Sequence, residues 1–390
     1  MITVEQAQEH LFNLIQRLPV EHIPLINAAG RVLAQDVAAN RDQPPFAASS
    51  MDGYALKSSE VERHAMFKVI GESAAGHGFD GTVGPGQTVR IFTGAPVPLG
   101  TDFVVIQEDT SRTGDLMTIA QDPGIKDNIR PLGGDFRVGT TLTAPQILTP
   151  QDIALLASMN IATVPVTRKP VIALISTGDE LVLPGEKPGP HQIIASNTFG
   201  LKAMLDGAGA TANLLPIARD TEQSLRTAFA RAAGSDLVIT IGGASVGDHD
   251  LVGKVAADLG MERSFYKVAM RPGKPLMAGR MGQMAMVGLP GNPVSAMICG
   301  YLFILPMIQK MMGLGTGRRP LEQAKLATGL DRNGPRQHYM RAIVESGQIS
   351  VFDSQDSSLL TVLSQANALV VRHANDPARA AGDVVDYIAI

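Results

Sequence analysis

At roughly 150 residues per domain, a chain of 390 residues is expected to form two or three domains rather than one. Hydrophobic residues make up 45% of the chain and charged residues 18%, a balance that excludes intrinsic disorder. The 33 Lys and Arg against 37 Asp and Glu give a net charge of −4, so no basic surplus indicates binding to nucleic acid or to an anionic membrane. Any anion site must therefore be local.

The single cysteine and the apolar pattern bear on the compartment. Cys299 has no second cysteine with which to form an internal disulfide, which fits a reducing environment. The first residues lack the basic and then apolar pattern of a secretion signal, and the longest apolar run, residues 296–308, is too short to span a bilayer. We expect a cytoplasmic protein with no membrane partner.

The first half of the chain changes from a helical pattern to a strand pattern. Apolar residues recur at helical spacing over residues 4–18, behind Thr3 as an N-cap, and Pro19 ends the pattern. Residues 40–138 show short alternating apolar runs separated by Gly and Pro clusters, which is typical of a β-rich module. A second helix is predicted to start behind the cap at Thr149, before a strand over residues 162–166.

From residue 168 the pattern indicates an α/β domain. Unalternated apolar runs, typical of buried parallel strands, are separated by amphipathic helical segments. The runs are residues 171–175, 214–217, 237–241, 265–270 and 285–289, and the helices are residues 196–206, 221–233, 250–259 and 292–312. Residues 318–390 return to short alternating strands and predict a small β-module at the end of the chain.

The residues that follow three of the buried strands are the first candidates for a site, because ligands of parallel sheets bind beyond the carboxyl ends of the strands. The three segments are residues 176–180 (STGDE), 242–250 (GGASVGDHD) and 290–295 (PGNPVS). Their glycines let backbone N–H groups approach a ligand, which favours a phosphate-bearing molecule. Ordinary turn and capping chemistry is the alternative interpretation of each segment taken alone.

Two sets of charged residues accompany these segments. Residues 271–275 (RPGKP) place two cations in a loop stiffened by prolines, which could hold an oxyanion or could be a solvated turn. Carboxylates also follow the apolar runs, and grouped carboxylates beside a phosphate indicate Mg²⁺. These are Asp179, Glu180, Asp220, Asp248 and Asp250. The eight histidines show no zinc-binding or catalytic spacing.

Taken together, the segments resemble the molybdopterin molybdenumtransferase family, which includes the bacterial MoeA proteins and the E domain of gephyrin. The matching segments occur in the family's order over nearly the whole chain. They are residues 50–55 (SMDGYA), 93–98 (TGAPVP), 176–181 (STGDEL), 242–248 (GGASVGD), 271–275 (RPGKP) and 288–295 (GLPGNPVS).

The resemblance implies an enzyme that inserts molybdenum from molybdate into adenylylated molybdopterin and releases AMP, with Mg²⁺ as cofactor. It also implies a homodimer of α/β multi-domain chains, in which the α/β domain has three layers and a mostly parallel sheet. The expected domains are an α/β domain of residues 1–18 and 168–316, a small connecting domain of residues 19–39 and 139–167, an inserted β-rich domain of residues 40–138 and a C-terminal β-barrel of residues 317–390.

The candidate site residues combine the strand-exit pattern with the positions that match the family's motifs. The expected catalytic residues are Asp52, Thr93, Glu180, Asp220, Asp250 and Lys274, and the expected metal ligands are Asp179, Glu180, Asp220 and Asp250. The expected substrate-binding residues are Arg130, Asp135, Thr177, Gly178, Gly242, Gly243, Ser245, Arg271, Pro290, Gly291, Asn292, Ser295, Arg336 and Ser357. Within this set the family's oxyanion positions fall on Arg271, Lys274, Ser295, Arg336 and Ser357.

The sequence departs from the family's motifs at two positions, and two other functions remain open. Arg271 stands where many members have Lys, which keeps the charge but changes the hydrogen-bond geometry, and Gly134 stands where a Glu often precedes the aspartate. The alternatives are a molybdopterin adenylyltransferase and a non-catalytic scaffold of the gephyrin kind. Candidate protein partners are a molybdopterin adenylyltransferase and the molybdoenzymes that receive the cofactor.

Overall fold

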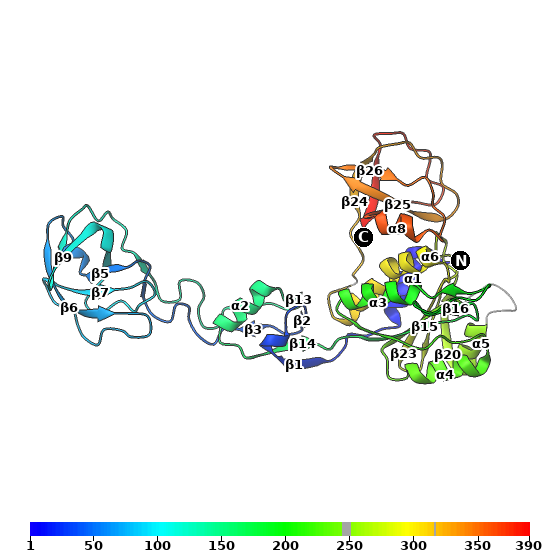
Figure 1. Ribbon diagram of the computed structural model, residues 1–390, viewed down its shortest axis with the longest axis horizontal. Coiled ribbons are helices and arrows are strands. Elements are labelled where there is room, and N and C mark those ends of the chain that lie inside the picture. The colour runs from blue at the N-terminus through cyan, green and yellow to red at the C-terminus, as the bar shows by residue number, and fades with distance from the viewer. Residues whose placement is uncertain (244–250, 316) are drawn as a thin grey trace. The chain divides into compact units, whose positions relative to one another are not determined.

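The computed structural model describes residues 1–243, 251–315 and 317–390 and confirms an α/β multi-domain fold (Figure 1). It divides into two compact units. The first unit comprises Met1–Glu21, Gly30–Ala34 and Val166–Ile390, and the second comprises His22–Ala29 and Gln35–Pro165. The four-domain boundaries given above remain a prediction.

The first unit is built on a six-stranded sheet whose central strands are buried on both faces. In sheet order the strands are β18 (Thr211–Leu214), β15 (Val171–Ser176), β19 (Leu237–Ile241), β23 (Met284–Leu289), β22 (Met277–Met281) and β20 (Met261–Tyr266). The first four pair in parallel, and β22 is antiparallel to both of its neighbours. Burial on both faces explains why β15, β19 and β23 are unalternated apolar runs, whereas the edge strands β18 and β20 are partly exposed.

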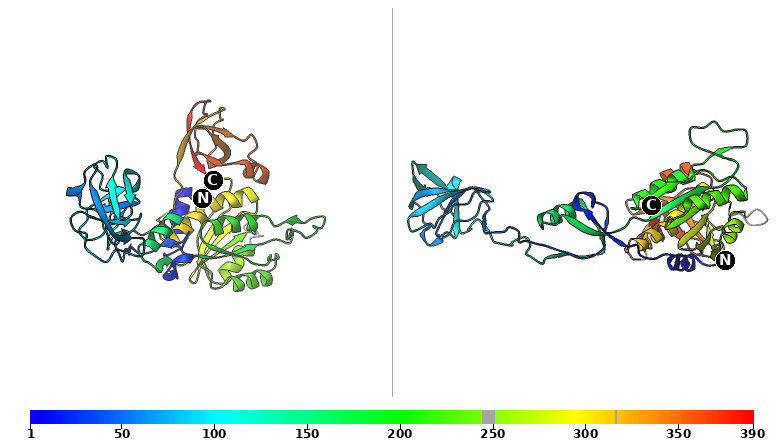
Figure 2. Two further views of the ribbon diagram at one scale, coloured as in Figure 1. Left: turned by 60° about the vertical axis from the view of Figure 1, so that its left-hand side comes forward. Right: turned by 90° about the horizontal axis from the view of Figure 1, so that it is seen from below.

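Helices cover both faces of this sheet and complete the three layers (Figure 2). On one face, Leu201 and Leu205 of α3 (Asn197–Gly207) and Leu11 of α1 (Val4–Asn13) pack against Ile172 and Ile239. On the other face, α4 (Glu222–Ala232) and α5 (Leu251–Asp258) pack against the alternate side chains of the same strands. The predicted capping box of Thr3 and Gln6 at the start of α1 is confirmed.

A long apolar helix runs through the core of the first unit. It consists of α6 (Pro293–Cys299), a π-helical turn η4 (Gly300–Ile304) and α7 (Leu305–Met311). Among the described residues this 19-residue helix, Pro293–Met311, is long and apolar enough to cross a membrane, but 78% of its apolar stretch is buried inside the protein. The apolar side chains of this helix therefore belong to the protein core, where Phe303 and Ile308 are fully buried.

The C-terminal part of the first unit is a closed five-stranded barrel, which confirms the predicted β-barrel (Figure 1). Its strands are β24 (Glu322–Leu326), β25 (Gln337–Glu345), β26 (Gln348–Val351), β27 (Ala368–Arg372) and β28 (Val384–Ala389), with α8 (Leu360–Gln365) before β27. Pairing of β25 with β27 closes the barrel. A strand of the preceding domain, β21 (Met270–Arg271), also pairs with β25, so the barrel is joined to the loop that follows β21.

The second unit contains a six-stranded sheet and the helix α2 (Pro150–Ser158). In sheet order the strands are β8 (Phe103–Ile106), β5 (Gly53–Leu56), β7 (Gln87–Ile91), β6 (Met66–Ser73), β10 (Leu116–Ile119) and β9 (Thr110–Thr113). Two short pairs join β4 (Ala48–Ser49) to β11 (Ile129–Arg130) and β3 (Val37–Ala38) to β12 (Thr141–Leu142). The predicted cap of α2 at Thr149 is confirmed.

The remaining elements are short. A four-stranded sheet has the order β1 (Val20–Pro24), β14 (Thr163–Thr167), β2 (Val32–Leu33) and β13 (Gln146–Ile147). A parallel pair joins β16 (Leu181–Val182) and β17 (Ile193–Ile194). The 3₁₀ turns are η1 (Leu25–Asn27), η2 (Ser58–Glu60) and η3 (Gln107–Asp109).

Three predicted elements have different bounds in the structure. The helix α1 ends at Asn13 rather than at residue 18, although Leu14 and Leu18 still pack against the core, and apolar spacing alone does not separate a helix from an irregular segment on the same core. The strand expected at 214–217 is β18 (Thr211–Leu214). The run 265–270 divides into β20 and β21 because Lys267 takes a positive φ of 70°.

Candidate functional site

The carboxyl ends of β15, β19 and β23 form one continuous edge. The Thr177 N–H donates to the carbonyl of Ile241 at 3.0 Å, and the Gly242 N–H donates to the carbonyl of Leu289 at 3.2 Å. A Cβ on Gly242 would lie 2.8 Å from the carbonyl oxygen of Thr177, and φ there is +90°, so this position requires glycine. The structure thereby brings together the predicted residues Thr177, Gly178, Gly242, Gly243, Pro290, Gly291 and Asn292.

The acidic residues after β15 and β18 are tied to each other through the backbone. The Asp220 N–H donates to Asp179 Oδ1 at 3.2 Å, and the Gly178 N–H donates to the carbonyl of Ala218 at 3.1 Å. Both carboxylates are exposed, as is that of Glu180. Arg219, which the sequence analysis did not select, donates to the carbonyls of Asp179 and Leu181 at 3.1 and 3.0 Å and so closes the loop.

The predicted metal ligands are placed only in part. Ser245 and Asp250 lie outside the described residues, together with Asp248. Within the described ranges, no three His, Cys, Asp or Glu side chains are grouped so that they could hold a metal ion. The exposed carboxylates of Asp179 and Asp220 nevertheless fit Mg²⁺, which binds through one or two carboxylates together with water and substrate phosphates.

A cationic cavity of about 350 Å³ lies where the α/β domain meets the barrel. It is lined by all the predicted oxyanion positions, which come from distant parts of the chain: Arg271, Lys274, Ser295, Arg336 and Ser357. In the part of the chain that the structure describes, neither the three cations of this cavity nor Asp356, which also lines it, takes part in an ion pair. The cavity can therefore offer its cations to an anion.

The loop that carries Lys274 has a fixed conformation. Gly273 has a φ of +103°, and a Cβ at this position would lie 2.7 Å from Cys299 Sγ of α6. The carbonyl of Lys274 accepts hydrogen bonds from the N–H groups of Val268 and Leu276 at 3.0 and 3.1 Å. This close packing against α6 places the cationic loop beside Ser295.

The barrel supplies the opposite wall of the cavity through Ser357. The Ser357 carbonyl accepts from the Val294 N–H at 3.1 Å, and its hydroxyl oxygen lies 3.1 Å from Asn292 Nδ2, which donates to it. Gln355 and Asp356 also line the cavity and were not selected from the sequence. A serine two residues after Asp356 is the sequence feature that could have identified this carboxylate as a turn-forming group. The N–H and hydroxyl of Ser358 donate to the Asp356 carboxylate, and these bonds lower the pKa of Asp356.

The strand that pairs with β21 carries a buried histidine. His338 is opposite Arg271 in the pairing of β21 with β25 and is 7% exposed. Burial, followed by the charges of Arg271 and Arg372, lowers the pKa of His338 to about 4. At neutral pH the imidazole is therefore neutral, and the positive charge of the cavity comes from arginine and lysine alone.

In the second unit, Asp52 and Thr93 form a hydrogen-bonded pair. Because β5 and β7 pair with Gly53 opposite Ile91, the residues just outside this pair meet at the strand ends. Both the N–H and the hydroxyl of Thr93 donate to Asp52 Oδ1 at 2.8 Å. These bonds, the backbone one first, lower the pKa of the half-buried Asp52 carboxyl.

Arg130 and Asp135 line a cavity of about 490 Å³ in the same unit. Gly94, the neighbour of Thr93, lines it as well, and pairing of Arg130 with Ala48 places the arginine at its wall. The predicted site residues of the second unit therefore form one neighbourhood. The short turns that carry them look like ordinary turns in the sequence, and only the strand pairing brings them together.

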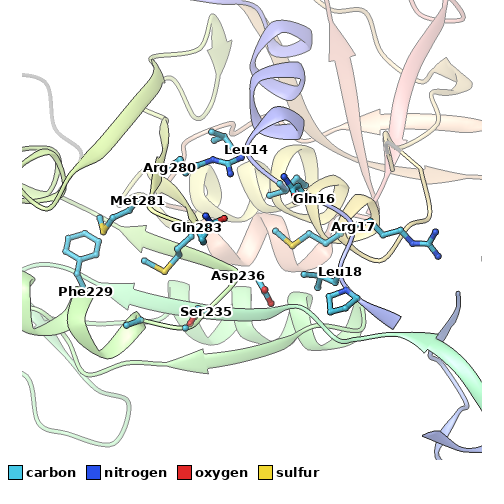
Figure 3. Close-up of a pocket in the computed structure, with 16 residues that line it drawn as sticks. Leu14, Gln16, Arg17, Leu18, Phe229, Ser235, Asp236, Arg280, Met281 and Gln283 are labelled. Carbon is cyan, nitrogen blue, oxygen red and sulfur yellow. The ribbon is translucent and has the colours of Figure 1, made fainter. Parts of the chain in front are cut away.

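Another cavity, of about 620 Å³, lies at the opposite edge of the α/β sheet (Figure 3). Asp236 and Met284, at the amino ends of β19 and β23, contribute to its wall. Asp236 is already bonded to both terminal nitrogens of Arg168, at 3.0 and 2.7 Å. Because ligands of parallel sheets bind at the carboxyl ends, we place the functional site at the other edge despite the larger volume here.

Comparisons with known proteins cover nearly the whole chain. Family models match for the MoeA N-terminal region (domain I and II) at residues 2–160, a probable molybdopterin binding domain at 173–310 and the MoeA C-terminal region (domain IV) at 323–390. The molybdopterin molybdenumtransferase of Haemophilus influenzae is 34% identical over 99% of this chain and 98% of its own length. That of Bacillus subtilis is 32% identical over 95% and 90% of the two chains.

The fold has a solved counterpart as well. The molybdopterin biosynthesis MoeA protein of Pyrococcus horikoshii aligns over 100% of this chain and 99% of its own, with a TM-score of 0.87 and 27% identity. Sequence motifs, domain models and fold agree along the full length. The chain therefore belongs to the molybdopterin molybdenumtransferase family of MoeA proteins.

Proposed function

We propose that this chain is an enzyme that inserts molybdenum from molybdate into adenylylated molybdopterin and releases AMP. The observation that carries the proposal is the cationic cavity, in which Arg271, Lys274 and Arg336 converge with the hydroxyls of Ser295 and Ser357. The relatives named above, which are molybdopterin molybdenumtransferases, support it. The cavity lies beside the strand exits of the domain that matches the molybdopterin-binding model.

Molybdate is a tetrahedral dianion, and the cavity offers it both charge and directed donors. The guanidinium groups of Arg271 and Arg336 can each give two parallel hydrogen bonds to oxyanion oxygens, and Lys274 adds a point charge. The hydroxyls of Ser295 and Ser357 can complete the coordination of the remaining oxygens. Since the cations are held on packed loops, these loops lose little conformational entropy when the anion binds.

The strand exits would hold the phosphate-bearing substrate. Gly242 and Gly291 lie close together, with 3.6 Å between the Gly242 Cα and the position of a Cβ on Gly291. Without side chains, this edge lets a phosphate approach the backbone closely. Asn292 borders both this edge and the cationic cavity, so the pterin side and the oxyanion side of the reaction adjoin.

Mg²⁺ would be held by Asp179, Glu180, Asp220 and Asp250, where it would neutralise charge on the phosphates as the anhydride bond breaks. Hydrogen bonds and close packing hold the residues of this edge in place. Asp179 is fixed by the Asp220 N–H, and Arg219 keeps the loop of Asp179 closed. Glu180 lies over Gly178, where a Cβ would be 2.3 Å from Glu180 Oε2.

We further propose that the chain works as a cytoplasmic homodimer, as the resemblance implies. In such a dimer Asp52 and Thr93 of the second unit, with Arg130 and Asp135, would complete the site of the partner chain. A molybdopterin adenylyltransferase would supply the substrate, and molybdoenzymes would receive the product. Light scattering of the purified chain at micromolar concentration tests the dimer directly, and a monomer would contradict it.

The activity is tested by AMP release from adenylylated molybdopterin, followed with and without molybdate in the presence of Mg²⁺. We expect AMP release that depends on molybdate and a product that activates an apo-molybdoenzyme. Consumption of ATP with free molybdopterin would indicate the adenylyltransferase instead. If neither reaction proceeds while the protein is folded and dimeric, the scaffold alternative is favoured.

A further inference from the structure

A buried arginine lies behind the cationic cavity without lining it. Arg341 of β25 is 1% exposed and is among the largest fully buried side chains of the described residues. In that part of the chain no carboxylate forms an ion pair with it. Burial lowers the pKa of Arg341, which reflects the cost of holding a cation away from water. Because burying an unpaired guanidinium is unfavourable, we expect Arg341 to make a structural contribution that offsets this cost.

The guanidinium donates only to neutral oxygens of one loop. Arg341 Nη2 donates to the carbonyl of Ser354 at 3.3 Å, and Nη1 donates to the carbonyl of Leu359 at 3.3 Å. Nε lies 3.4 Å from Gln355 Oε1. The two carbonyls belong to opposite ends of residues 354–359, so a single side chain fixes both ends of this loop.

Gln355 completes the attachment from the side of the loop. Its Oε1 accepts from the Arg341 N–H at 2.9 Å, and its Nε2 donates to the carbonyls of Arg341 and Phe352 at 3.1 and 2.8 Å. The side-chain amide of Gln355 thus binds both the backbone and the guanidinium of Arg341. We call this pair the loop clamp.

The loop that the clamp holds carries Ser357 into the cationic cavity. Ser357 is bonded on its other side to Val294 and Asn292 at the start of α6. The same strand β25 pairs with β21, which carries Arg271, and follows directly on Arg336. One strand therefore positions both walls of the cavity, one through strand pairing and the other through the loop clamp.

We propose that Arg341, through the loop clamp, is a positioning residue that sets the affinity of the cavity for a tetrahedral oxyanion. This rests on the proposed function of the cavity. Arg341 does not touch the ligand. It holds Ser357 in place before the anion arrives, so that binding does not have to order residues 354–359.

A second buried arginine of the barrel provides the matched control. Arg372 is 2% exposed but forms an ion pair with Asp376, and its Nη2 donates to the carbonyls of Asp331 and Pro377 at 3.0 and 2.7 Å. None of these partners lines the cationic cavity. Loss of Arg372 should therefore reduce the stability of the barrel without a selective effect on oxyanion binding.

The test compares Arg341→Met, Arg341→Lys and Arg372→Met in the full-length protein. For Arg341→Met we expect the KM for molybdate to rise about tenfold, as for removal of a side chain that orients a ligand-binding group. The kcat at saturating molybdate and the KM for the pterin substrate should stay within about twofold. Arg341→Lys keeps the charge but loses the fork, so its effect should be intermediate. Amide hydrogen exchange at residues 353–360 should become faster in Arg341→Met, less so in Arg341→Lys, and should not change in Arg372→Met.

The outcomes separate the clamp from a purely structural role. An unchanged KM for molybdate in a folded Arg341→Met protein would overturn the proposal, as would a joint loss of kcat and melting temperature like that of Arg372→Met. If Arg341→Met does not fold, Gln355→Met removes the other half of the loop clamp. Because Gln355 also lines the cavity, this variant supports the clamp only if the same KM rises together with faster amide exchange at residues 353–360, and unchanged exchange would overturn it. If Lys274→Ala impairs molybdate binding but neither clamp variant does, only the clamp is wrong. If AMP release by the wild type is independent of molybdate, the proposed function fails, and calorimetric titration of each variant with molybdate alone decides on the clamp.

Discussion

The cationic cavity and the acidic strand exits belong to the same unit but are built in different ways. The cavity is enclosed by two loops and a barrel, and its Lys274 loop is packed so closely on α6 that Gly273 has no room for a side chain. The acidic residues Asp179 and Asp220 are exposed and joined only through a backbone hydrogen bond. The proposed oxyanion site is therefore organised by protein groups alone, whereas the acidic edge would need further ligands to bind a metal ion.

This difference has a physical reason. An oxyanion can be bound by protein groups alone, because cations and hydroxyls supply both its charge balance and its hydrogen bonds. Mg²⁺ keeps several waters and takes oxygens from substrate phosphates, so a rigid all-protein cage is not required. If the comparison is right, changes in the cavity act on the affinity for molybdate and on stability, while changes at the acidic edge act on the requirement for Mg²⁺.

The largest effect is expected for Lys274→Ala. Loss of a charge-assisted contact in an organised cavity should raise the KM for molybdate about 100-fold, equivalent to about 2.7 kcal/mol. Molybdate-dependent AMP release measures it, with Lys325→Ala as the control, because Lys325 is an exposed lysine of the barrel outside the cavity. Equal KM values in the two variants would contradict an oxyanion site at Lys274.

The buried His338 should make the stability of the first unit depend on pH. Its pKa is lowered from 6.5 to about 4 in the folded chain, so its stabilising effect is complete above about pH 6.5 and is lost as the pH falls towards 4. Replacement by glutamine, His338→Gln, should remove this dependence, a difference of about 2 kcal/mol in unfolding free energy at pH 5. Thermal unfolding between pH 7.5 and 4.5 measures it, with the exposed His373 as the control in His373→Gln. Parallel pH profiles for wild type and His338→Gln would rule out this linkage.

The packing of the Lys274 loop is tested by Gly273→Ala. The new Cβ would lie 2.7 Å from Cys299 Sγ at a φ of +103°, so we expect a loss of stability of about 1–3 kcal/mol. The control is Gly347→Ala, where φ is +79° but no atom lies within 4 Å of the added Cβ. Denaturant unfolding compares the two, and equal losses would show that close packing against α6 is unimportant.

The smallest effect is expected at the acidic edge. Asp179→Asn keeps an oxygen that can accept from the Asp220 N–H but removes the charge that attracts Mg²⁺. We expect the Mg²⁺ concentration for half-maximal AMP release to rise about tenfold, equivalent to about 1.4 kcal/mol. The KM for molybdate should not change. Asp122→Asn, an exposed turn carboxylate of the second unit, serves as the control. A larger effect on molybdate than on Mg²⁺ would remove the distinction between the two regions.

Local sequence was enough to predict the elements whose signals are short-range. The caps at Thr3 and Thr149 and the buried parallel strands of the α/β domain were predicted and are present in the structure. The end of α1 at Asn13 was not predicted, because Leu14 and Leu18 pack on the core outside the helix. Apolar spacing reports which side chains are buried, and it does not report the backbone conformation that buries them.

Sequence motifs also selected the five oxyanion positions of the cationic cavity and the acidic residues of the strand exits, but not Gln355 and Asp356. Tertiary structure decided what lies between and behind them. Three features depend on strand pairing and burial between segments far apart in the chain: the loop clamp of Arg341 and Gln355, the pairing of His338 with Arg271, and the closure of the acidic loop by Arg219. A sequence shows which charges are present, but only the folded chain determines which of them lose water and which neighbours then share their hydrogen bonds.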